Sequence, residues 1–149
     1  MPIGNVCQSF RPIVEFALGI GILKFVGQDA ANLSGIMQFE RLGPGLLESA
    51  YEACLAHELM VSGLRVERQK AVPLIYEGVK LDCGFRADVV VEGKVVVELK
   101  CKDALHPVDY SQLLSHLRLL GLEVGLLINF HVAVLKDGIT RMVNDYHGD

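Results

Sequence analysis

The chain has 149 residues, of which 51% are hydrophobic and 21% charged, and its net charge at pH 7 is −4. This length suits one domain with a substantial core, and the composition argues against disorder. The negative charge argues against a strongly basic coat that binds nucleic acid nonspecifically. It does not exclude a nuclease, because metal-binding carboxylates are acidic and basic groups can be local.

The N-terminal 31 residues give the weakest structural signal and are treated as a separate, helix-forming segment before a single domain over residues 32–149. The stretch Pro12–Gly27 is apolar, but it is too short and too rich in glycine to cross a bilayer, and it fits a secretory signal poorly. We therefore expect a cytoplasmic protein without a membrane partner. Its cysteines form no C-x-x-C pair, so they are expected to be reduced thiols, mostly in the core, and not ligands of an iron-sulfur cluster: Cys7, Cys54, Cys83 and Cys101.

Two helices are predicted around a Gly-Pro-Gly break. A short one covers Asn32–Arg41, and a well-defined one covers Leu46–Val61 and ends at Gly63. The second helix has an apolar stripe at helical spacing, formed by Leu47, Ala50, Tyr51, Cys54, Leu55 and Leu59. Glu48, in its first turn, fits either a favourable interaction with the helix N-terminus or a functional carboxylate, and its position alone does not decide between them. Glu52, one turn on, is consistent with a solvated side chain.

Three consecutive antiparallel strands are expected next, followed by a helix that crosses over to a parallel strand. Pro73 predicts an edge or a break in the first strand region. The last strand is expected to lead into a hairpin around Lys136-Asp137-Gly138. The predicted ranges are strands Leu64–Tyr76, Val79–Val91 and Lys94–Cys101, helix Pro107–Leu120, strand Glu123–Asn129, and hairpin strands Val132–Leu135 and Ile139–Val143.

The second and third strands are rich in valine and are predicted to be buried, yet they carry Asp88, Glu98 and Lys100. Strand alternation places Glu98 and Lys100 on one face. A two-residue loop would leave Asp88 on the other face, whereas a three-residue loop, Glu92-Gly93-Lys94, places it opposite Glu98. We predict the three-residue loop, because it gathers two carboxylates and an ammonium at one point.

Two adjacent carboxylates repel unless a proton or a cation lies between them. Oxygen ligands of this kind suit Mg²⁺ or Mn²⁺, and a lysine two residues along could orient a water molecule, as in metal-assisted phosphodiester hydrolysis. From spacing alone, a salt-bridge network on a sheet face explains the same three charges equally well.

The predicted helix Pro107–Leu120 carries Tyr110, Leu113, Leu114 and Leu117 on its core stripe. Gln112 and His116 lie one turn apart on a neighbouring face and could point to the same place. For His116 a structural or surface role is favoured. Gln112 fits a solvated amide or, if functional, a group that contacts phosphate or orients the lysine.

The order of a helix, three antiparallel strands, a helix and a strand, with Asp and Glu-x-Lys on the central hairpin, resembles the PD-(D/E)XK nuclease fold. The stretch Gly45-Leu46-Leu47-Glu48-Ser49-Ala50-Tyr51 is similar to the signature of the GxxExxY family within that superfamily. Further support comes from Phe85–Asp88, Val97–Lys100, Ser111–Leu114 and Gly125–Phe130. The resemblance implies an α/β fold: a restriction-endonuclease-like α/β/α sandwich with a mixed central sheet and an αβββαβ core.

The resemblance also implies residue roles and partners. Asp88, Glu98 and Glu48 would hold Mg²⁺ or Mn²⁺, Lys100 would position water, and Gln112 would border the site. The implied partner is nucleic acid, with DNA favoured, and a homodimer or a protein partner stays open. The alternative is a nuclease-fold module that binds without cleaving. Two departures are Ala87, where the superfamily name has proline, and His116, where relatives usually carry tyrosine.

Overall fold

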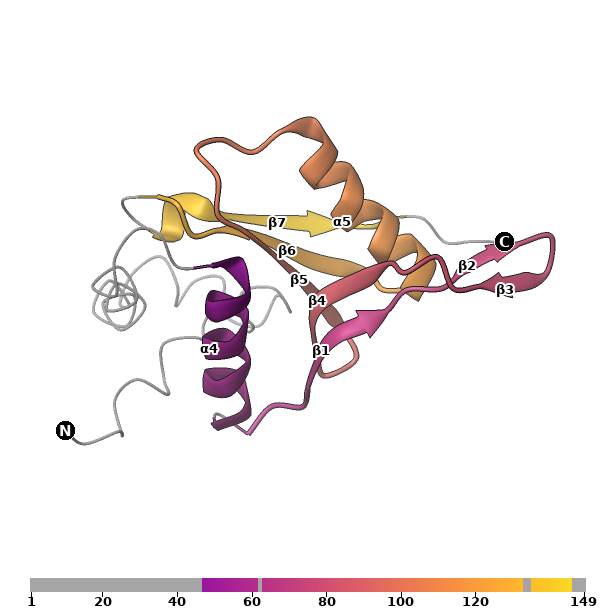
Figure 1. Ribbon diagram of the computed structural model, residues 1–149, viewed down its shortest axis with the longest axis horizontal. Coiled ribbons are helices and arrows are strands. Elements are labelled where there is room, and N and C mark those ends of the chain that lie inside the picture. The colour runs from indigo at the N-terminus through magenta and orange to yellow at the C-terminus, as the bar shows by residue number, and fades with distance from the viewer. Residues whose placement is uncertain (1–46, 62, 133–134, 146–149) are drawn as a thin grey trace.

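The structure is a computed structural model that describes residues 47–61, 63–132 and 135–145. Figure 1 shows a central sheet with one helix on each side and a small hairpin projecting from one end. The elements, in chain order, are α4 (Glu48–Val61), β1 (Val66–Ala71), β2 (Leu74–Tyr76), β3 (Val79–Leu81), β4 (Arg86–Val91), β5 (Val95–Lys100), α5 (Pro107–Leu120), β6 (Val124–Asn129), the 3₁₀ turn η2 (Leu135–Gly138) and β7 (Ile139–Val143).

The five-stranded sheet has the order β1-β4-β5-β6-β7, and β5 and β6 are its parallel pair. The other neighbouring strands are antiparallel. Helix α5 provides the crossover between β5 and β6, as the sequence predicted. The predicted α/β/α sandwich with a mixed sheet is therefore confirmed.

The sheet separates two apolar clusters. On the α4 face, Tyr51, Leu55 and Leu59 of the helix pack with residues of the central strands such as Val97 and Leu99. On the α5 face, Leu113 and Leu117 pack with a second set from the same strands: Val90, Val96 and Leu127. Each central strand thus buries both of its faces, which is why its sequence is almost continuously apolar.

The β4–β5 turn has the predicted three-residue connection. Val91 pairs with Val95 and Val89 with Val97, and Glu92 and Gly93 between the strands have φ values of 55° and 62°. Counting one residue further along each strand sets Asp88 opposite Glu98, although the ladder itself ends at Val89 and Val97. The predicted register of the hairpin is confirmed by these pairs.

Both helix C-termini lie where glycine signals placed them. Helix α5 has the predicted bounds, and Gly121 follows it with a left-handed φ of 67°. Helix α4 ends before Gly63, whose amide donates to the Met60 carbonyl. Its start at Glu48 lies two residues after the predicted start, and Leu47, expected on the apolar stripe, is 74% exposed.

Two strand predictions need correction. The first two strand regions are each interrupted, so that β1 and β4 belong to the main sheet while β2 and β3 form a separate two-stranded sheet. The interruptions fall at Pro73, which cannot donate to a ladder, and around Gly84, whose φ is 75°. The two described residues of the predicted strand Val132–Leu135 are not in a strand: Val132 lies in a bend, and Leu135 starts η2.

Both predicted N-terminal helices, Pro12–Gly27 and Asn32–Arg41, lie outside the described residues. Among the cysteines that the structure describes, Cys54 and Cys101 are partly buried and Cys83 is exposed. The expectation that the cysteines lie mostly in the core is wrong for Cys83, whereas Cys101 packs against the apolar cluster on the α4 face.

Candidate active site

Asp88 lies where β4 and β5 stop pairing. The last antiparallel pair is Val89 with Val97, and beyond it the Leu99 amide donates to Asp88 Oδ2 at 2.9 Å. A side-chain carboxylate thus takes the place of the main-chain acceptor that a continued ladder would supply. The other Asp88 oxygen, Oδ1, accepts from Gln69 Nε2 on β1 at 3.3 Å. Asp88 is therefore held from both neighbouring strands.

Glu98 is buried beside Asp88 with 1% of its surface exposed. Burial is the largest of the effects that raise the pKa of its carboxyl to about 7. The hydrogen bond with His116 opposes that shift, whereas Asp88 adds to it through charge repulsion and a carboxyl–carboxyl hydrogen bond. The two carboxyl groups are thus close enough to share a proton, and a cation can take that proton's place.

The Glu-x-Lys pair of β5 is matched by a Gln-x₃-His pair on α5. His116 Nδ1 lies 2.5 Å from Glu98 Oε1, and Lys100 Nζ donates to Gln112 Oε1 at 3.0 Å. Two residues along a strand and four along a helix cover similar lengths, about 7 Å and about 6 Å. Each charged group of the strand therefore meets one polar group of the helix, as the spacing of Gln112 and His116 suggested.

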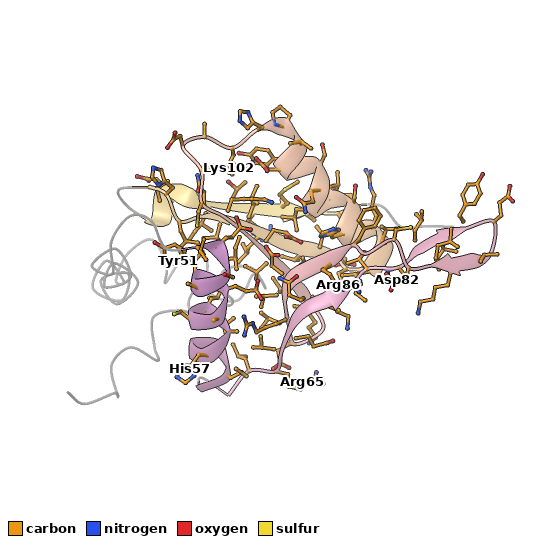
Figure 2. All side chains as sticks on the ribbon, in the orientation of Figure 1. Tyr51, His57, Arg65, Asp82, Arg86 and Lys102 are labelled. Carbon is orange, nitrogen blue, oxygen red and sulfur yellow. The ribbon has the colours of Figure 1, made fainter. Side chains whose placement is uncertain are left out.

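Asp109 anchors the segment that connects β5 to α5. It is 3% exposed, and Lys102 Nζ donates to both of its oxygens, at 2.7 and 2.9 Å. Its Oδ2 also accepts from the His106 amide at 2.8 Å, at the start of the helix. Burial by itself would raise the pKa of Asp109, but Lys102 and the His106 amide outweigh it and hold the pKa below its usual value. Figure 2 shows Lys102 projecting from this connection.

Asn129 fixes the same connection from the end of β6. Its side-chain oxygen accepts from the Lys102 amide at 3.2 Å, and its side-chain nitrogen donates to the Lys102 carbonyl at 2.8 Å. The Phe130 amide donates to the Lys100 carbonyl at 2.8 Å, and the Phe130 ring stacks on Tyr51 of α4 with centroids 4.5 Å apart. The backbone on both sides of Lys100 is therefore held in place.

Glu48 and Glu52 bring two further carboxylates from α4. Partial loss of hydration raises the pKa of Glu48, and its electrostatic interactions with Lys100 and Asp88 show that its side chain lies near the site. Glu52 is 5% exposed, which contradicts the expectation of a solvated side chain. It accepts hydrogen bonds from Arg68 Nε at 3.1 Å and Gln69 Nε2 at 2.7 Å.

The donor set fits a divalent metal of the magnesium type. Asp88 and Glu98 supply hard oxygen atoms, and magnesium is commonly held by one or two carboxylates together with water and phosphate oxygens. Among the described residues, no three His, Cys, Asp or Glu side chains are grouped closely enough to hold an ion by themselves. The arrangement thus brings together the two strand carboxylates and places Glu48 in their surroundings rather than with them as a third ligand.

Some site residues were missed by the sequence reasoning. For His116 a structural or surface role was favoured; the surface role is wrong, because the side chain is 5% exposed and bonded to Glu98. Its spacing from Gln112 was the signal that could have found it. Asp109, at the third position after His106, fits a helix-capping pattern. Glu52 and Gln69 had no local signal, because their roles depend on strands and a helix that meet only in the folded chain.

A mixed sheet between two helices, with Asp and Glu-x-Lys where its central strands separate, defines the restriction-endonuclease-like class of α/β proteins. The sequence model of the PD-(D/E)XK nuclease superfamily matches residues 33–142, so the chain belongs to that superfamily. No curated protein and no solved structure gave a significant match. Within the part of the chain that the structure describes, every helix is too short or too polar to cross a bilayer.

Proposed function

We propose that this protein is a metal-dependent nuclease that hydrolyses phosphodiester bonds in nucleic acid. The observation that carries this proposal is the meeting of the Asp88 and Glu98 carboxyl groups where β4 and β5 separate, beside the Lys100 ammonium. A buried Glu98 beside a half-buried Asp88 is costly for a fold, so the presence of this pair in the central hairpin supports a functional role.

Asp88 and Glu98 would hold Mg²⁺ or Mn²⁺. When bound, such an ion polarises a phosphate and makes water a better nucleophile at neutral pH. The chain itself fixes the two ligands: the Leu99 amide and Gln69 orient Asp88, and His116 orients Glu98. Outer partners of this kind are commonly needed for full metal affinity.

Lys100 would position water or a phosphate oxygen. Its side chain is 14% exposed, and Asp109 Oδ1 lies 4.0 Å from its Nζ. The hydrogen bond to Gln112 and the attraction to Asp109 limit its movement while leaving donor capacity, since an ammonium has three N–H groups. Glu48, from the helix end, would adjust the charge of the site and contact water around the ion.

The alternative is a nuclease-fold module that binds nucleic acid without cleaving it. Two properties of Glu98 favour this alternative. One of its oxygens is already bonded to His116, and its pKa of about 7 leaves the carboxyl group partly protonated at neutral pH. A protonated carboxyl is a poor metal ligand.

Three finer assignments belong to the same proposal. The stretch from Gly45 to Tyr51 supports membership of the GxxExxY family. DNA is the favoured substrate, on the strength of the superfamily resemblance. The thiols of Cys83 and Cys101, which form no disulfide, support a cytoplasmic location.

The test is to incubate wild type and Glu98→Ala with single- and double-stranded DNA and RNA, in Mg²⁺, in Mn²⁺ and in chelator, while metal binding is measured by calorimetry. Metal binding with cleavage that Glu98→Ala abolishes supports the nuclease. Metal binding without cleavage of any substrate supports the binding module. A wild-type protein that neither binds metal nor cleaves contradicts the nuclease. Nucleic-acid binding by that protein, measured by fluorescence anisotropy, then supports the binding module, and its absence supports a structural salt-bridge network.

A further inference from the structure

Gln69 has an unusual backbone conformation for its place in the sheet. It lies inside β1 with a φ of 49°, a left-handed value that non-glycine residues seldom adopt. The pairs on either side of it, Arg68 with Val89 and Lys70 with Ala87, place Gln69 opposite Asp88. A conformation of this kind persists only where its surroundings impose it, and it is found disproportionately at functional sites.

The conformation places the Gln69 amide group between two carboxylates. Its Nε2 donates to Glu52 Oε2 at 2.7 Å and to Asp88 Oδ1 at 3.3 Å. An amide nitrogen has two hydrogens, so a single side chain can satisfy both acceptors. Gln69 therefore links the buried acid of α4 to the acid of β4.

The anchor on the α4 side is itself fixed. Glu52 is buried, and its other oxygen, Oε1, accepts from Arg68 Nε at 3.1 Å. Arg68 offsets the charge of Glu52, so the Gln69 amide has a rigid acceptor on one side. The shorter of its two hydrogen bonds is the one to Glu52, which indicates that Glu52 holds Gln69 and Gln69 in turn holds Asp88.

We propose that Gln69 is a positioning residue for Asp88: its amide, held by the Arg68–Glu52 pair, fixes the Asp88 carboxylate in the orientation that lets it act together with Glu98. The metal part of this inference rests on the proposed function. The orientation part does not, because it concerns the protein alone. It predicts that loss of the amide releases Asp88, although β1 remains in the sheet.

The Leu99 amide reports on Asp88 directly, since it donates to Asp88 Oδ2. The experiment compares its hydrogen exchange in the metal-free full chain with that of the Phe130 amide, which donates to the Lys100 carbonyl without involving Asp88. The variants are Gln69→Ala, which keeps the backbone strain, and Gln69→Gly, which relieves it. Lys70→Ala is the matched control on the same strand, because the Lys70 ammonium pairs with Glu67 on the surface. Thermal unfolding and Mn²⁺ titration complete the set.

We expect both Gln69 variants to speed exchange at Leu99 and not at Phe130, and Gln69→Gly to unfold at a higher temperature than Gln69→Ala. Where wild type binds Mn²⁺, both should weaken binding by about 10- to 100-fold. Unchanged Leu99 exchange, or equal acceleration at Leu99 and Phe130, would overturn the proposal. If wild type binds no Mn²⁺, the proposed function fails, and selective acceleration at Leu99 still supports the positioning of Asp88 by Gln69.

Discussion

The molecule contains two hairpins of similar composition and opposite surroundings. The β4–β5 hairpin lies at the centre of the sheet, and its six valines are all buried. The β2–β3 hairpin projects from the body (Figure 1), and its register places Leu74, Tyr76, Val79 and Leu81 on one face. Of these, Tyr76 and Val79 are 61% and 56% exposed. Burial here depends on position in the topology rather than on how apolar a strand is.

Because the two hairpins differ in burial, their charged side chains differ in energetic importance. Asp82, at the base of β2–β3, is exposed, and its ion pair with Arg86 is a surface pair, which is worth little. Asp88 and Glu98 lie in the central hairpin, where each must be partnered. Substitutions that are matched between the hairpins can therefore separate functional acids from surface ones.

The largest effect is expected from Asp88→Asn or Glu98→Gln in a cleavage assay with Mn²⁺. Each removes one oxygen ligand charge while keeping the shape of the side chain. We expect the cleavage rate to fall by at least about 10²–10³-fold, as for loss of one electrostatic group in an active site. Asp82→Asn, in the other hairpin, should leave the rate unchanged. Equal losses at Asp82 and Asp88 would contradict the assignment.

The next effect concerns stability. Leu99→Ala removes a fully buried side chain from the α4 face and should lower the free energy of unfolding by about 2–5 kcal/mol. The same change at Leu81, which is 39% exposed, should alter it by no more than about 0.5 kcal/mol. Urea denaturation of both variants measures the difference. Comparable losses would show that the β2–β3 hairpin is covered in solution.

The third effect is a dependence of stability on pH. The folded-state pKa of Glu98 is about 7, above its ordinary value of 4.5, so between these values the folded state binds more protons than the unfolded state. Stability from this group is therefore present below pH 4.5 and is lost as the pH rises through 7, by up to about 3 kcal/mol. Glu98→Gln should remove that loss and be the more stable form at pH 8. Parallel stability curves for the two proteins from pH 5 to pH 8 would refute the burial of an ionisable Glu98.

The smallest effect is expected at the edge of the site. Gln112→Ala removes the acceptor that steadies Lys100, and because Gln112 is exposed the loss should be about 1 kcal/mol, or roughly fivefold in cleavage rate. Ser111→Ala, on the neighbouring exposed position of α5, serves as the control, since its hydroxyl bonds only within the helix. A rate equal to wild type in Gln112→Ala would mean that Asp109 alone is enough to orient Lys100.

The features that sequence predicted correctly are those with local signals. The runs of valine on either side of Glu92-Gly93-Lys94 predicted the central hairpin and its register. Pro107 and Gly121 predicted the bounds of α5. The closeness of the Asp88 and Glu98 side chains was expected from that register. In the same way, Pro73 signalled the break between β1 and β2, although not that the strands beyond it would leave the main sheet.

The features that sequence could not predict depend on contacts between distant elements. From the sequence, Glu52 is predicted to be a surface residue of a helix. In the fold it is bonded to Arg68 and Gln69 of β1. The left-handed conformation of Gln69 has no signal in its residue type, because glutamine rarely adopts it. The bond from His116 to Glu98 needed the distance between α5 and β5, which spacing along either element does not give.

The most direct test of the central claim is a calorimetric titration of Mn²⁺ at pH 8 into wild type, Asp88→Asn, Glu98→Gln and Asp82→Asn. If Asp88 and Glu98 form one site, wild type and Asp82→Asn bind one ion per chain, and both of the other variants lose that binding. Retention of wild-type affinity in either Asp88→Asn or Glu98→Gln would contradict the account.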